Sequence, residues 1–208
     1  MSERGALLPT LDRLFAGPRD SILTIEAFLE GLESRSYAFA IAALNLPNCI
    51  PTGIPWLSTI TGVPMFLLVI QYFLGRPVPS LPNLVGRRGL PRGKLQGFLA
   101  RVRRHIERLE NAIHPRRTWW VTGVPRRCLQ VTWMLLIVLL ALPIPFDNLL
   151  PAWAILFFCL ALIEGDGAMA MLGWLFTFFT VVWTVFLLMI GHAAILAAIA
   201  AVQHILFD

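Results

Sequence analysis

Charge is what this chain lacks most. Asp, Glu, Lys and Arg make up 14% of its 208 residues, whereas 57% are hydrophobic; an average soluble domain has about 25% charged residues. From Cys128 to the C-terminus there is no Lys or Arg at all. A soluble domain of this length cannot bury so much apolar surface. The composition therefore excludes an ordinary soluble enzyme, a disordered chain and a disulfide-rich secreted module, and predicts an all-α, polytopic integral membrane protein.

Cysteines and catalytic motifs are also scarce. The three cysteines, Cys49, Cys128 and Cys159, form no C-x-x-C pair and match no metal site, so we expect reduced packing residues. The sequence has no phosphate-binding loop, no H-E-x-x-H motif and no Ser-His-Asp order. We therefore expect no cofactor, no metal and no enzymatic activity.

The basic residues are concentrated in the middle of the chain. Thirteen of the 17 lie between Gly75 and Arg127, a stretch with only two acids. Because this stretch separates apolar segments, the positive-inside rule places it in the cytoplasm, and anionic lipid headgroups explain its charge better than nucleic acid does. We expect residues 76–127 to form a cytoplasmic linker and no nucleic acid to bind.

Two amphipathic helices are predicted outside the apolar segments. The first, Ile22–Leu32, is acidic and is capped by Asp20 or Ser21. The second, Leu95–Ile113, has one apolar stripe and carries four arginines on its other faces, Arg101, Arg103, Arg104 and Arg108. Either this helix lies in the plane of an anionic lipid surface, or it packs on the membrane domain with a solvated charged face. Opposite charge predicts that both helices lie on the same side of the membrane, with Glu26, Glu30 or Glu33 near the arginines.

The apolar segments divide the chain into four regions. Residues 1–36 form an amphipathic N-terminal segment, 37–75 a first membrane half, 76–127 the linker and 128–208 a second membrane half. The last apolar run, Ala168–Phe207, has twice the roughly 20 residues that one crossing needs, so we predict two helices divided near Gly191-His192. This makes about six membrane segments.

Two of these regions are interrupted by proline in the same way. Leu46-Pro47 and Pro55 recur as Leu142-Pro143 and Pro151 at an offset of 96 residues. Paired interruptions in two halves are typical of an internal repeat around a central site, and both parallel and inverted repeats stay open. We predict that the turns Pro47–Pro55 and Pro143–Pro151 meet near the membrane interior.

Polar side chains in and beside these turns are the candidate binding residues. Asn48, Thr52 and Asn148 carry donors or acceptors in the turns, and Gln71 is the other polar candidate in the first half. Glu164 and Asp166 are candidates to supply charge, although Glu164-Gly165-Asp166-Gly167 is also good turn chemistry. A small-residue edge on the last helix suits either packing within the chain or a homodimer seam; its members are Gly191, Ala194, Ala198 and Ala201.

Three blocks of the chain together resemble the ExoD family of exopolysaccharide-synthesis proteins. The first runs from Leu46-Pro47 through Pro51, Gly53, Pro55, Gly62 and Pro64 to Leu74-Gly75-Arg76; the second is the basic linker with Pro115; the third holds Leu142-Pro143-Ile144-Pro145-Phe146, Asn148-Leu149-Leu150-Pro151-Ala152, Glu164 and Asp166-Gly167. The resemblance implies a multi-pass protein of the bacterial inner membrane that is associated with exopolysaccharide production, and it implies no reaction.

We therefore expect a non-enzymatic factor for exopolysaccharide synthesis or export. The form that we expect is a small transporter built on the two repeats. The alternatives are a scaffold within a polysaccharide assembly complex and, more remotely, a lipid-intermediate enzyme. Membrane lipids with anionic headgroups, a second copy of the chain and polysaccharide-synthesis proteins are the expected partners. A polar cavity at the level of the proline turns would favour the transporter, and tightly packed, dry turns would favour the scaffold.

Overall fold

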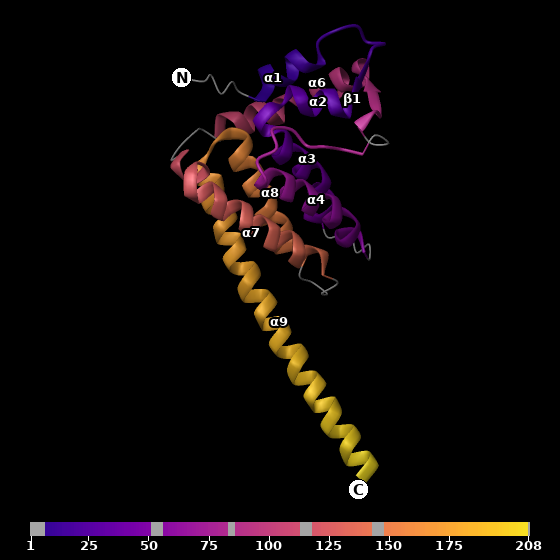
Figure 1. The fold of residues 1–208 in the computed structure, drawn as a ribbon, viewed down its shortest axis with the longest axis vertical. Coiled ribbons are helices and arrows are strands. Elements are labelled where there is room, and N and C mark those ends of the chain that lie inside the picture. Colours follow the sequence, from indigo (N-terminus) through magenta and orange to yellow (C-terminus); the bar gives the residue numbers. More distant parts are fainter. Residues whose placement is uncertain (1–6, 51–55, 83–85, 113–117, 143–147, 208) are drawn as a thin grey trace.

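The computed structural model describes residues 7–50, 56–82, 86–112, 118–142 and 148–207. They form an N-terminal layer across one end of a bundle of apolar helices, and a last helix that runs along the bundle and continues beyond it (Figure 1). Apart from one sheet of two three-residue strands, the described elements are helical, which confirms the predicted all-α class.

The N-terminal layer combines the start of the chain with the basic linker. Its elements are α1 (Leu7–Phe15), β1 (Ile22–Thr24), α2 (Ile25–Gly31), β2 (Gly89–Pro91) and α6 (Arg92–Ala112). The two strands are antiparallel, with Ile22 opposite Pro91. These segments share one apolar core, whose buried members are Leu8, Leu11, Phe15, Leu23, Leu29, Leu32 and Leu99. The acidic segment and the basic helix therefore lie in the same layer.

The helix expected over Ile22–Leu32 begins three residues later than predicted. Ile22–Thr24 pairs with β2 instead of entering the helix. The side chain of Thr24 then caps α2, because its Oγ1 accepts a hydrogen bond from the backbone N–H of Ala27 at 3.3 Å. Strand pairing with a segment 65 residues away along the chain is a tertiary effect, which local helical spacing does not predict.

Four apolar helices form the bundle: α3 (Ser36–Asn45), α4 (Leu57–Phe73), α7 (Gly123–Ala141) and α8 (Leu149–Glu164). Short 3₁₀ helices precede α3 (η1, Glu33–Arg35), follow it (η2, Leu46–Cys49) and precede α7 (η3, Thr118–Val121). Helices α3 and α7 each contact both α4 and α8. Their common core includes the fully buried side chains of Ile41, Met65, Trp133, Ile155 and Phe158.

The bundle consists of two hairpins that run the same way. Helices α3 and α7 lead away from the N-terminal layer, and α4 and α8 lead back to it (Figure 1). Near the layer, Arg126 of α7 donates to the hydroxyl of Tyr72 in α4 at 2.9 Å. At the opposite end, the Thr59 hydroxyl of α4 donates to the carbonyl of Ala141 in α7 at 2.9 Å. We call this opposite end the distal end of the bundle.

The last helix, α9 (Gly167–Phe207), is unbroken. Gly165 ends α8 in the left-handed conformation, at φ 70°, and α9 then packs along α8. The predicted division near Gly191-His192 was wrong, because neither residue removes a backbone donor as proline does. Five apolar helices therefore replace the six expected segments in the described part of the chain. Among the described residues, one stretch is long and apolar enough to cross a bilayer, Gly167–Ala193.

Candidate functional site at the distal end of the bundle

Two chain interruptions come together at the distal end of the bundle. Helix α3 ends at Asn45, and Pro47 opens the 3₁₀ turn η2, where a missing backbone N–H is tolerated. Asn148 precedes α8, and Pro151 lies in the first turn of that helix, whose N–H groups have no helical partner. Helix α8 contacts η2 directly. The described parts of the two proline-interrupted regions therefore meet, as predicted.

Hydrogen bonds from two predicted asparagines connect these interruptions to α4. Asn48 Nδ2 donates to Thr61 Oγ1 at 2.9 Å, and that hydroxyl donates to the carbonyl of Leu57 at 3.0 Å. Asn148 Nδ2 donates to Ser58 Oγ at 3.1 Å. Both asparagines thus bond to the first turns of the same helix. We call the group Asn45, Asn48, Ser58, Thr61 and Asn148 the polar junction.

Asn45 is the member of the polar junction that the sequence analysis missed. Its side chain is 0% exposed, and Nδ2 donates to the carbonyl of Ala152 in α8 at 2.7 Å. A backbone carbonyl can only accept, so this bond determines which way the amide is turned. The signal in the sequence was an asparagine at the end of an apolar helix, directly before Leu46-Pro47.

Two carbonyl oxygens of the polar junction are buried without a hydrogen-bond donor in the described structure. They are Oδ1 of Asn45 and Oδ1 of Asn148. The two side-chain amides lie one turn of α8 apart. Asn45 bonds to the carbonyl of Ala152, and the N–H of Ala152 donates to the backbone carbonyl of Asn148. An unsatisfied buried acceptor costs about 1–3 kcal/mol. The junction can therefore accept further hydrogen bonds from a bound group.

Of the other polar candidates in the first half, Gln71 does not belong to the junction and Thr52 is not described. Gln71 lies near the opposite end of α4, where its side chain exchanges two hydrogen bonds with the backbone of Ser80. Thr52 and the central residues of both turns, 51–55 and 143–147, lie outside the described residues. The prediction that the turns meet is therefore tested only at Leu46–Cys49 and Asn148.

The expectation that Glu164 or Asp166 supplies charge to the turns was wrong. Glu164 is the last residue of α8 and Asp166 follows it; this helix has 16 residues and is about 24 Å long at the α-helical rise. Asp166 instead caps α9, because its Oδ1 accepts from the backbone N–H of Ala168 at 2.8 Å. This hydrogen bond supports the interpretation of Glu164-Gly165-Asp166-Gly167 as a turn between two helices.

The family model described as "Exopolysaccharide synthesis, ExoD" matches residues 7–186, which include both hairpins and the polar junction. The chain belongs to the ExoD family. It is 31% identical over 196 residues to Protein ExoD of Rhizobium meliloti (strain 1021). The aligned region covers 92% of this chain and 80% of that protein. It is also 28% identical over 167 residues to the uncharacterized protein slr1875 of Synechocystis, covering 80% and 79% of the two chains. No solved structure shows significant similarity to the chain.

Membership of the ExoD family connects the chain with exopolysaccharide synthesis.

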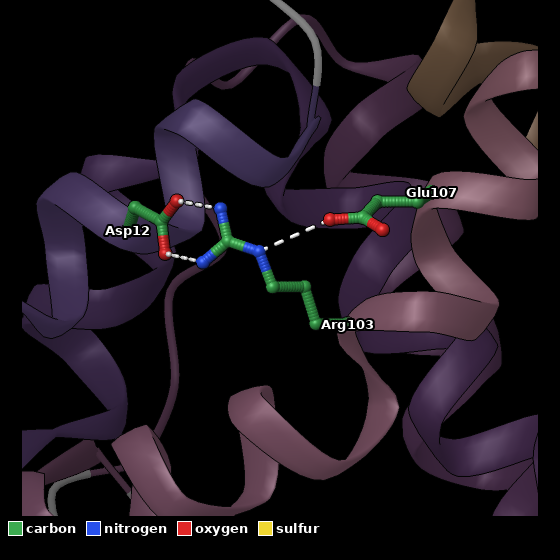
Figure 2. A network of polar contacts seen from close by, with 3 residues as sticks. All are labelled: Asp12, Arg103 and Glu107. Atoms are coloured by element: carbon green, nitrogen blue, oxygen red, sulfur yellow. Dashed lines mark hydrogen bonds and ion pairs between the residues drawn. The ribbon is translucent and has the colours of Figure 1, made fainter.

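In the N-terminal layer, one arginine of α6 pairs with two acids. The guanidinium of Arg103 forms an ion pair with both carboxylate oxygens of Asp12 in α1, the shorter contact at 3.2 Å, and also contacts Glu107 at 3.1 Å (Figure 2). These side chains are about half exposed, so each pair contributes about 0–1 kcal/mol. Asp12, which the sequence analysis did not consider, is thus an acid that pairs with the basic helix.

The apolar stripe of α6 is covered by protein only in part. Leu99 is buried in the core of the N-terminal layer, and Leu95 and Ile106 pack against that core, whereas Phe98 of the same stripe is 61% exposed. Arg101 and Arg104 are exposed, and the side chain of Arg108 lies outside the described residues. The packed residues fit our second interpretation, a helix packed on the protein with a solvated charged face, and the exposed Phe98 leaves the lipid-surface interpretation open. Contact of these arginines with lipid stays a prediction.

Proposed function

We propose that this ExoD-family protein is an integral protein of the bacterial inner membrane with a non-enzymatic role in exopolysaccharide synthesis or export. In this proposal it is a small transporter, and the polar junction is its solute site. The observation that carries the proposal is the placement of Asn45, Asn48 and Asn148 together at one level of an otherwise apolar bundle. Placing a polar side chain inside the membrane costs free energy, and such side chains commonly mark the pathway of a substrate or ion.

The chemistry of the junction favours an uncharged, hydroxyl-rich solute. Amides and hydroxyls can both donate and accept, and two amide oxygens find no donor among the described residues. Glu164 and Asp166 are too far away to balance a cation, and an ion without a counter-charge is expensive to bury; Asp147, which precedes Asn148 in the sequence, lies outside the described residues. A sugar hydroxyl can fill the vacant acceptor positions without bringing charge. This class of solute agrees with the family's association with exopolysaccharide.

The two hairpins also support the proposed internal repeat, in its parallel form. Asn45 at the end of α3 bonds to the first turns of α8, and Ala141 at the end of α7 bonds to Thr59 in the first turn of α4. Asn45 and Ala141 are related by the same offset of 96 residues as the proline motifs. Each hairpin thus contacts the other through equivalent ends, which a two-fold axis along the bundle would produce.

A scaffold without transport is the second candidate, and one observation favours it. The side-chain N–H groups of all three asparagines already have partners within the chain. In that case the junction would be a structural clamp between the hairpins. A cavity of about 150 Å³ in the described structure lies away from the junction, between α1 and α6 beside Asp12 and Arg103.

Leucine substitutions separate these two candidates. Asn45→Leu, Asn48→Leu and Asn148→Leu would each be expressed in cells that lack the protein, and secreted exopolysaccharide would be measured together with the amount of protein in the membrane. A transporter should lose output while the protein still inserts. Gln71→Leu is the matched control, because it makes the same kind of change at the other end of α4. Full output from all three asparagine variants would refute the solute site, and loss of output together with loss of the inserted protein would favour the structural clamp.

A further inference from the structure

We infer that both hairpins enter the bilayer from the cytoplasmic side and end within the hydrocarbon, so that α9 alone reaches the opposite surface. The inference concerns the surface formed by the distal end of the bundle and the exposed part of α9, and its partner is the interior of the bilayer. It rests on the membrane location in the proposed function. It replaces the six expected crossings by one.

Aromatic and basic side chains mark the membrane surface near the N-terminal layer. Trp119 of η3 is 57% exposed, and Trp120 stacks beside it with ring centroids 4.4 Å apart. The next residue, Val121, packs in one cluster with Ala161 of α8 and Ala170 of α9. Tryptophan pairs next to arginines are typical of the interface between lipid and water. This level of the membrane therefore coincides with Ala170.

The distal end of the bundle lies opposite Thr184 on α9. Helices α8 and α9 are antiparallel, and the rings of Phe157 and Phe176 face one another at 5.1 Å. Continuing that register brings Leu149, the first residue of α8, to the level of Thr184. Thr184 is also the last buried residue in the described part of α9. From Ala170 to Thr184 is 14 residues, about 21 Å at 1.5 Å per residue.

A depth of about 21 Å is short of the roughly 30 Å hydrocarbon core. Beyond Thr184, α9 continues with exposed apolar side chains: Val185, Phe186, Leu188, Met189 and Ile190. The first polar side chain after them is His192, 22 residues from Ala170, or about 33 Å along the helix. This distance matches one crossing of the hydrocarbon. Thr184 and His192 are eight residues apart, so the distal end lies about 12 Å from the far surface.

The composition of the distal end also fits hydrocarbon. Residues 46–57 and 142–150 contain no Lys or Arg and one acid, Asp147, whereas the opposite end of the bundle has Arg76, Arg126 and Arg127. Among the described residues of the distal end, the exposed side chains are apolar, with Ile50 63% and Trp56 64% exposed. Irregular backbone is tolerated in lipid only where the protein satisfies it. The Thr59 hydroxyl does this for the carbonyl of Ala141, the last residue of α7.

Depth measurements on single cysteines test the inference. Cys128 is exposed and would be changed to serine, while Cys49 and Cys159 are buried. Trp56→Cys and Leu142→Cys then report on the two hairpins, His192→Cys on the far surface and Arg104→Cys on the cytoplasmic side. In spheroplasts, an impermeant maleimide should label His192→Cys from outside, Arg104→Cys only after the cells are opened, and the two hairpin positions from neither side.

A second measurement keeps the test valid if one variant fails to fold. The same cysteines, carrying an environment-sensitive fluorophore, would be placed in phosphatidylcholine vesicles with bromine at different depths of the acyl chain. Deep bromines should quench the hairpin positions most, and shallow bromines should quench His192→Cys most. Labelling of either hairpin cysteine from either side, or shallow quenching at both, overturns the inference. Recovery of the protein in the soluble fraction would instead refute the membrane location itself, and neither result depends on exopolysaccharide output.

Discussion

Replacing Gly173 by alanine should weaken the packing of α9 against α8. A Cβ atom at this position would lie 2.5 Å from both Cδ1 and Cε1 of Phe158. The Phe158 ring is fully buried and packs edge-on against Trp174, with centroids 5.6 Å apart, so it cannot move aside freely. Extra volume in a well-packed core costs about 1–3 kcal/mol. Gly173→Ala should therefore have a free energy of unfolding lower than that of Gly191→Ala by about 1–3 kcal/mol.

Gly191→Ala is the matched control for this measurement. Gly191 lies on the same helix, and an added Cβ would meet no atom within 4 Å. Both substitutions gain the same helix propensity, about 0.8–1 kcal/mol in water, so their difference isolates the steric contact. Denaturant-induced unfolding in micelles would give both values. Equal stability of the two variants would contradict the α8–α9 packing, and Phe158→Leu in the Gly173→Ala background should recover part of the loss.

Three further substitutions test separate contacts. Thr24→Ala removes the cap of α2 and should cost about 0.5–2 kcal/mol, measured by thermal unfolding; no loss would contradict the cap. Thr59→Val keeps the shape but leaves the carbonyl of Ala141 without its donor, so the free energy of unfolding should fall by about 1–3 kcal/mol; a stable variant would exclude this role. A double-mutant cycle of Asp12→Asn and Arg103→Gln should give a coupling of about 0–1 kcal/mol that decreases with salt; a larger, salt-insensitive coupling would contradict the exposed geometry.

The positions of the apolar helices could be predicted from the sequence because their ends carry local signals. The expected second membrane half, 128–208, contains most of α7 and all of α8 and α9, and the stripe Leu95–Ile113 became most of α6. Proline and glycine determine such ends through missing donors and left-handed backbone. The strand at Ile22–Thr24 and the short helix α1 could not be found in this way, because their partners are distant in sequence.

The candidate site was predicted in part, and its errors have identifiable causes. Asn48 and Asn148 were found because they accompany the proline motifs, and both bond to α4. Asn45 was missed because it precedes the motif within an apolar helix. The error over Glu164 could have been avoided by counting residues, since α8 separates it from Asn148 by about 24 Å. The small-residue edge begins at Gly191, and the structure describes no side chain beyond Ala193, so the homodimer stays a prediction.

The location of the polar junction explains why it contains amides and hydroxyls instead of charges. If the distal end lies about 21 Å into the bilayer, an ionised side chain there would be far more expensive than an amide. Hydrogen bonds within the junction reduce the remaining cost, and two carbonyl oxygens that find no donor among the described residues are the part left uncompensated. Glu164 and Asp166 lie at the other end of α8, and Asp147, next to Asn148 in the sequence, lies outside the described residues. If the junction is the solute site that we propose, its amides and hydroxyls recognise solutes by their hydroxyl groups, so neutral sugars should bind there in preference to charged ones.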